Sequence, residues 1–195
     1  YTGDITGGSS NAGLFGYDSM NDCGDISIVD YSYSGNISGS YNAGIIGYAS
    51  ITNCGNIDIS NCFYSGTITA GTKNNGIIGY DSIQDCLIVN VIDCSSTSSL
   101  TGSSHSSIIG YGSMNNCSQV NIQNCHYDSD ISGLSNAGLF GFDSIQNCPI
   151  VSITECTYTG DITGGSYNAG IIGKESINNC GDISIMDYSY SGDIS

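Results

Sequence analysis

Short stretches of alternating apolar and polar residues recur along this chain at a regular interval. Apolar residues, mostly β-branched, occupy every second position in six segments: Ile26 and Ile28, Ile57 and Ile59, Val89 and Val91, Val120 and Ile122, Val151 and Ile153, and Ile183 and Ile185. Successive side chains of a strand point to opposite faces, so this alternation between turn residues predicts strands. No segment shows a helical pattern.

A second recurring feature is a four-residue anchor in which two apolar residues lie between small residues, as in GLFG or GIIG. The anchors begin at residues 13, 44, 76, 107, 138 and 170, so the copies are 31 or 32 residues apart. In every copy a serine and then a cysteine follow the anchor at fixed spacing. The segment before the anchor is rich in glycine, serine and asparagine, which favour turns and loops. Residues 1–195 therefore form a single repeat domain of six copies.

One copy of this repeat offers three or four short strands, and it cannot bury its apolar face alone. Stacked copies can bury that face, because in-register stacking at ~4.8 Å places equivalent residues over one another in columns. The sequence thus predicts an all-β fold, a parallel β-solenoid (β-helix) of six coils with no globular α domain. A β-propeller is set aside because its blades usually need about 40 residues or more.

All ten cysteines fall into two columns of the repeat. One column contains Cys23, Cys54, Cys86, Cys117, Cys148 and Cys180, and the other contains Cys62, Cys94, Cys125 and Cys156. Neighbours ~4.8 Å apart within a column lie inside the ~7 Å limit for bridged Cα atoms, whereas an extended strand separates the two cysteines of one coil. Disulfides between neighbouring coils are one expectation. Buried thiols that act as small apolar fillers are the alternative.

The two consecutive apolar residues of each anchor raise the question of an exposed apolar surface. Strand alternation would turn one of the two outward, beside a column of aromatic residues that follows the anchor. Six stacked apolar groups would make a stripe suited to lateral self-association. The candidate stripe consists of Phe15, Ile46, Ile78, Ile109, Phe140 and Ile172. The alternative is a bend or bulge that turns both side chains inward.

The charge of the chain limits the classes of partner that it can bind. It has 18 acidic residues, two lysines and no arginine, for a formal net charge of −16. Such a chain cannot neutralise a run of phosphates or pair with an anionic lipid surface, and it lacks an apolar run of ~20 residues. We expect no nucleic-acid partner and no membrane insertion. Aspartate is interspersed with asparagine in two turn columns, which predicts a solvated face where amides separate stacked carboxylates and hydrogen-bond to them.

Metal binding and catalysis have little support in the sequence. The cysteines lack C-x2-C spacing, the two histidines lie in different coils, and the calcium-binding solenoid pattern GGxGxDx is absent. Nearly every acidic residue belongs to a repeated column, whereas a catalytic site depends on unique residues. His105 replaces a turn asparagine and is expected to be a solvent-facing turn residue. We therefore expect no metal, no cofactor and no enzymatic activity.

The anchor, preceded by Y-[ST]-G-[DN]-I-[ST]-G at residues 1–7, 33–39 and 158–164, resembles the GLUG-motif repeat of bacterial and other cell-surface proteins. The resemblance covers all six copies, with Ser107 in place of the first glycine of the fourth. It implies a secreted, repetitive surface protein, often an adhesin or a non-catalytic region attached to a secreted enzyme, and it transfers no catalytic residue. The cysteine content and two N-glycosylation acceptor sequences, at Asn36 and Asn116, also fit an extracellular location.

Internal similarity extends to the two ends of the sequence. Residues 158–195 match residues 1–38 at 29 of 38 positions, and no capping segment is visible. We expect a window of a longer array or an uncapped filament subunit. The expected function is a structural extracellular repeat protein that assembles with itself, end to end, laterally or both, into filaments or surface fibres. An adhesin-type module that recognises surface glycans or proteins is the alternative. An ice-binding solenoid is a third, based on the hydroxyl column of Thr6, Ser38, Thr69, Thr101, Ser132 and Thr163.

Overall fold

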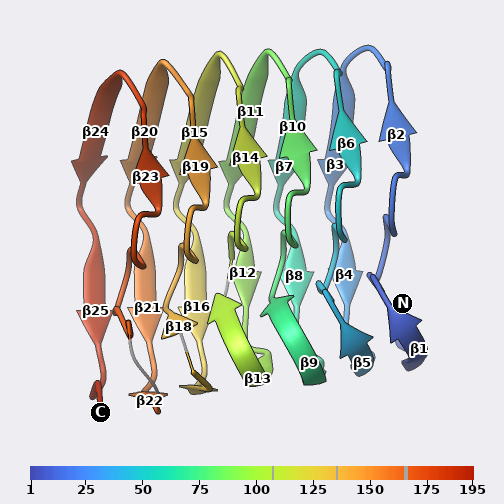
Figure 1. Ribbon diagram of the computed structural model, residues 1–195, viewed down its shortest axis with the longest axis vertical. Coiled ribbons are helices and arrows are strands. Elements are labelled where there is room, and N and C mark those ends of the chain that lie inside the picture. Colours follow the sequence, from blue (N-terminus) through green and yellow to red (C-terminus); the bar gives the residue numbers. More distant parts are fainter. Residues whose placement is uncertain (107, 135, 165–166) are drawn as a thin grey trace.

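The computed structural model of the chain describes residues 1–106, 108–134, 136–164 and 167–195. Ser107, the first residue of the fourth anchor, lies outside these ranges. Within them every regular element is a strand, and the strands pair in parallel with their equivalents in neighbouring coils to form four sheets. Figure 1 shows the coils stacked side by side from the N-terminal coil to the C-terminal coil. The predicted all-β parallel β-solenoid of about six turns is confirmed.

Two of the sheets follow the anchor in each coil. The first contains β2 (Met20–Asn21), β6 (Ile51–Thr52), β10 (Ile83–Gln84), β14 (Met114–Asn115), β19 (Ile145–Gln146) and β23 (Ile177–Asn178). The second contains β3 (Ile26–Val29), β7 (Ile57–Ser60), β11 (Ile88–Ile92), β15 (Gln119–Gln123), β20 (Ile150–Thr154) and β24 (Asp182–Met186).

The other two sheets complete each coil before the next anchor. The third contains β4 (Ser32–Tyr33), β8 (Phe63–Tyr64), β12 (Ser95–Ser96), β16 (His126–Asp128), β21 (Thr157–Thr159) and β25 (Ser189–Ser191). The fourth contains β1 (Ile5–Ser9), β5 (Ile37–Ser40), β9 (Thr67–Asn75), β13 (Ser99–Ser106), β17 (Ile131–Ser132) and β22 (Ile162–Thr163), with β18 (Asn136–Ala137) paired to β13.

The pairing register follows the columns of the repeat. Ile57 of β7 pairs with Ile26 of β3 on one side and with Val89 of β11 on the other. Ile57 and Val89 are fully buried, whereas Asp58 between the two isoleucines of β7 is exposed. Each coil therefore contributes inward-facing apolar residues to one continuous core, as the period-two pattern predicts.

Corners of the coil explain the columns of aspartate and asparagine. Asp22, Asn53, Asp93 and Asn124 have φ between 50° and 54°, in the left-handed region that these residue types tolerate better than most others. The Asn53 amide donates to the Asp22 carboxylate at 2.5 Å, and the Asn124 amide donates to Asp93 at 2.7 Å. The predicted hydrogen bonds between stacked amides and carboxylates are therefore confirmed.

A column of tyrosines fills the interior opposite the anchor. Tyr33 and Tyr64 are fully buried, and their ring centroids lie 5.6 Å apart in a stacked arrangement. The Tyr64 hydroxyl donates to the carbonyl of Gly35 in the preceding coil at 3.2 Å. A Cβ atom on Gly44, at the start of an anchor, would lie 2.3 Å from the Tyr64 ring. This close approach explains why the anchor begins with glycine.

The anchor itself is a bend rather than a straight strand. The backbone N–H groups of Ile45 and Ile46 both donate to the Ile77 carbonyl, at 3.2 and 3.0 Å. The same paired donation occurs at Leu14 with Phe15, at Ile108 with Ile109, and at Leu139 with Phe140. Because two consecutive N–H groups converge on one carbonyl, strand alternation is interrupted and both side chains turn to the interior.

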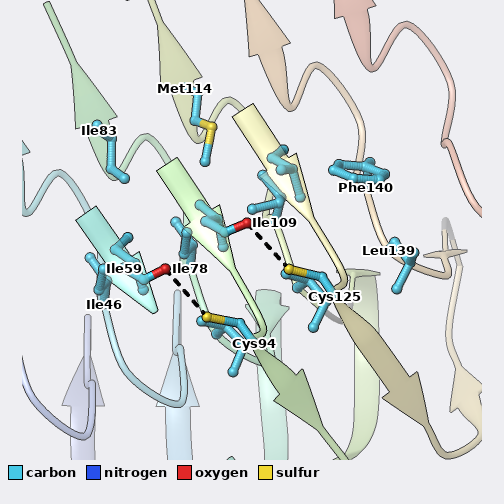
Figure 2. Close-up of a cluster of buried hydrophobic side chains, with 14 of the residues drawn as sticks. Ile46, Ile59, Ile78, Ile83, Cys94, Ile109, Met114, Cys125, Leu139 and Phe140 are labelled. Carbon is cyan, nitrogen blue, oxygen red and sulfur yellow. Dashed lines mark hydrogen bonds between the residues drawn. The ribbon is translucent and has the colours of Figure 1, made fainter. Parts of the chain in front are cut away.

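The prediction of an exposed lateral contact stripe is therefore wrong. Ile46, Ile78, Ile109 and Phe140 are 0% exposed, and Phe15 and Ile172 are partly buried against the same core. Figure 2 shows the four fully buried members among the other interior side chains. The alternative expectation, a bend that buries both residues, describes the structure.

Candidate binding surface

The cysteine columns lie in the core, and all ten cysteines are free thiols in the structure. Eight are buried, Cys180 is partly exposed and Cys23 is exposed. Cys94 and Cys125 donate to the carbonyls of Ile59 and Val91 in their preceding coils, at 3.6 and 3.5 Å (Figure 2). The eight buried cysteines lie in the interior of the solenoid, where both the buried-thiol and the disulfide expectation place them. Bridging between neighbouring coils stays a prediction.

Hydrogen bonds between neighbouring thiols shift the pKa values of the buried cysteines in opposite directions. Hydrogen bonds with the Cys156 and Cys94 thiols, together with burial, raise the pKa of Cys125 well above its ordinary value. Hydrogen bonds with the Cys125 thiol lower the pKa values of Cys94 and Cys156. The thiolate is the reactive form, so the Cys125 thiol is the one held in its unreactive, protonated state.

The two N-glycosylation candidates are both exposed. The Asn36 side-chain oxygen accepts a hydrogen bond from the Thr67 backbone N–H at 3.0 Å, and the Asn116 amide donates to Asp85 at 2.6 Å. Glycosylation at either residue stays a prediction.

His105 is only 2% exposed, so the expectation of a solvent-facing residue is wrong. It pairs in register with Asn74 of β9 and Asn136 of β18, and both of these residues are buried as well. In the part of the chain that the structure describes, no three His, Cys, Asp or Glu residues lie close enough to hold a metal ion. The same residues include no helix of the length and apolar character required to cross a membrane.

The aromatic residues that follow the anchors form a second column on the outside of the solenoid. This aromatic ladder consists of Tyr17, Tyr48, Tyr80, Tyr111 and Phe142. Neighbouring ring centroids are 5.0 to 5.1 Å apart, so each ring contacts the equivalent ring of the next coil. Tyr17 is 60% exposed, and the other four rings are partly exposed. The ladder places aromatic surface in contact with solvent across five coils.

Both lysines of the chain lie over this ladder. The Lys73 ammonium is 3.7 Å from the Tyr80 ring centroid and 4.0 Å from that of Tyr111. Lys174 takes the ladder position in the sixth coil, with its ammonium 5.5 Å from the Phe142 centroid and 4.6 Å from that of Tyr167. Aromatic rings attract such cations through their quadrupoles. The only two basic side chains of a strongly acidic protein are thus concentrated on one face.

A pocket of about 290 Å³ opens beside the ladder, and both lysines line it. Its other lining residues include Tyr111, Asn136, Phe142 and Tyr167. Tyr167 is 63% exposed, whereas Asn136 is 1% exposed and donates through its amide to the Thr163 carbonyl at 3.3 Å. Among the described residues no donor reaches the Asn136 side-chain oxygen. The pocket therefore combines aromatic walls, two ammonium groups and a buried acceptor without a partner.

Partial burial shapes the charges around this pocket. It lowers the pKa of Lys73, an effect that nearby Asp81 opposes, and it raises the pKa values of Asp81 and Asp143. Lys174 lies 3.5 Å from Glu175 in an ion pair whose side chains are 42% and 53% exposed. Such exposed pairs contribute little, so the Lys174 ammonium stays available to another anion.

Sequence reasoning missed this pocket. Lys73 lies near the end of β9, before an anchor, and Lys174 follows an anchor. Their coils are not neighbours, so the sequence treats them as isolated residues. One available signal is that Lys174 interrupts a column that is aromatic in the other five coils. Only the stacking of the coils brings the two residues to one pocket.

Comparisons of this chain with family models, with curated proteins and with solved structures found no match.

Proposed function

We propose that this chain is a non-enzymatic structural repeat protein of the extracellular space whose coils stack axially into fibres. The observation that carries the proposal is that the coils are interchangeable. At the junctions between coils, equivalent residues pair in parallel in all four sheets, as Ile28 pairs with Ile59 and Ile122 with Ile153. The strands of one coil can therefore pair in the same register with a neighbouring coil of the same chain or with a coil of another copy. The cysteine content and the exposed sequons support an extracellular location.

Because both apolar residues of the anchor are buried, we propose axial assembly in place of lateral assembly. Ile46 and Ile109 belong to the core, so they cannot form a lateral contact between two solenoids. Axial pairing of strand edges, which needs only backbone groups and stacked side chains, is the assembly that the geometry supports.

A proline on the edge strand β3 tests the axial proposal. The N–H groups of Ile26 and Asp30 donate to Asn56 and Ser60 of the next coil. Alternation along the strand directs the Val29 N–H to the opposite side, where a further strand would pair. Val29→Pro removes that donor, and Val29→Thr is the matched control that keeps it.

We expect the original protein and Val29→Thr to form fibres in negative-stain electron microscopy and to sediment faster as concentration rises. Val29→Pro should remain as short rods with an unchanged circular dichroism spectrum. Discrete rods of the original protein at every concentration, or fibres of Val29→Pro equal to those of the control, would count against the proposal.

A second candidate function is an adhesin-type binding module, and the aromatic ladder with its pocket favours it. Exposed aromatic rings with a few converging polar groups are typical of binding sites for small organic ligands and sugars. The two functions are compatible, because a fibre can present the pocket at regular intervals. Titration with oligosaccharides, designed below, tests this candidate.

A further inference from the structure

The size and walls of the pocket suit one ring-shaped ligand unit. Its volume of about 290 Å³ is at the lower end of the range for small-molecule sites. Tyr111 and Phe142 have ring centroids 5.1 Å apart, and Tyr167, which is 63% exposed, also lines the pocket. These side chains offer apolar surface to the C–H groups of a ligand ring.

The buried oxygen of Asn136 indicates that the ligand is a hydrogen-bond donor. An unpaired buried acceptor destabilises the protein, and a ligand hydroxyl that donates to it would remove that penalty. The Asn136 amide nitrogen already donates to Thr163, which directs the amide oxygen to the other side of the group. A hydroxylated ring therefore fits both the walls and the acceptor.

The two lysines indicate that the ligand also has a negative charge. The ammonium groups of Lys73 and Lys174 are the only positive side chains in a chain of net charge −16, so an anion has no other cationic residue to bind. Asp81, Asp143 and Glu175 lie close to the lysines and would repel a densely charged polymer. Because these three acidic residues outnumber the two lysines, a ligand with one carboxylate per ring is favoured over a more densely charged one.

We propose that the pocket between Lys73 and Lys174 binds a carboxylate-bearing pyranose, a uronic acid unit of an extracellular polysaccharide. The pyranose ring packs on Tyr111, Phe142 and Tyr167, a hydroxyl donates to Asn136, and the carboxylate accepts from the lysine ammonium groups. This inference rests on the binding-module function proposed above and gives that function its class of ligand.

Isothermal titration calorimetry with a matched pair of ligands tests the proposal. One ligand is an oligouronide, and the other is the same oligosaccharide with its carboxylates reduced to alcohols. Because hydrogen bonds to charged groups contribute about 1.5–3 kcal/mol, the original protein should bind the oligouronide at least about tenfold more tightly than the reduced form.

Three variants locate the site. Lys174→Met should weaken oligouronide binding about tenfold and leave binding of the reduced ligand within about twofold. Tyr167→Ser should weaken both ligands, and the fold tolerates it because Ser10 takes the same position in the first coil with φ 67°. Tyr188→Ser removes the same group from another exposed position, outside the pocket, and should change neither affinity. Equal denaturation midpoints would show that all three variants fold.

The outcomes separate the two proposals. If the protein binds neither ligand, both the acidic-sugar site and the binding-module function fail. Equal affinity for the two ligands, with both lost in Tyr167→Ser, would keep the binding module and overturn the acidic class. Oligouronide binding that Lys174→Met and Tyr167→Ser leave unchanged would overturn the pocket as its site.

Discussion

The strand columns and the loop column before the anchor use the same backbone repeat in different ways. In a strand column the residue type hardly varies, as at Ile57 and its partners in neighbouring coils. The loop column is the position three residues before the first residue of each anchor. It contains Ser10, Tyr41, Lys73 and Tyr167, all with φ between 55° and 77°. The backbone conformation is kept while the side chain changes from a hydroxyl to an aromatic ring or an ammonium group. Constant columns therefore build the rod, and departures from the repeat give individual coils their chemistry.

The largest expected effect comes from ionising the interior tyrosine column. Burial is the main cause that raises the pKa of Tyr33 from 10.0 to about 12 and that of Tyr64 further. A raised pKa in the folded state means that the stabilising contribution is complete below pH 10 and is lost as pH rises through about 12. We expect the tyrosinate absorbance to rise and the β-sheet circular dichroism signal to disappear over the same alkaline pH range.

That experiment has a clear contrary outcome. If every tyrosine ionises while the circular dichroism spectrum stays unchanged, Tyr33 and Tyr64 are not buried parts of the core.

Side-chain truncation has a smaller expected effect, and it distinguishes a buried core position from a position in the loop column by the free energy of unfolding. Ile78→Ala removes a fully buried side chain and should lower the free energy of unfolding by about 2–5 kcal/mol. Tyr41→Ser removes a larger side chain from the loop column, where it stacks on Tyr48 and Tyr80, and should cost less than about 1.5 kcal/mol. Urea denaturation of the two variants measures the difference. A small effect of Ile78→Ala would restore the rejected idea of an exposed stripe.

The fold could be predicted from the sequence because its cause is visible there. Period-two residues such as Ile57 and Ile59 predict the strands, and the fixed spacing of cysteines such as Cys62 and Cys94 predicts columns. Stacking follows because one copy cannot bury its own apolar face.

The anchor could not be predicted in the same way. A sequence such as GIIG does not reveal that Ile45 and Ile46 donate to one carbonyl, so alternation alone placed one of them outside. The pocket was missed for a different reason. Lys73 and Lys174 occupy different columns, and their proximity depends on loop geometry that the repeat pattern does not encode.

The central claim is that binding chemistry resides where coils depart from the repeat. Backbone NMR of the labelled protein, titrated with the oligouronide, tests it most directly. We expect amide shift changes confined to the pocket, around Tyr111, Phe142, Tyr167 and Lys174, with β7, β11 and β15 unchanged. Shift changes spread equally over all six coils, or located on the strand columns, would contradict it.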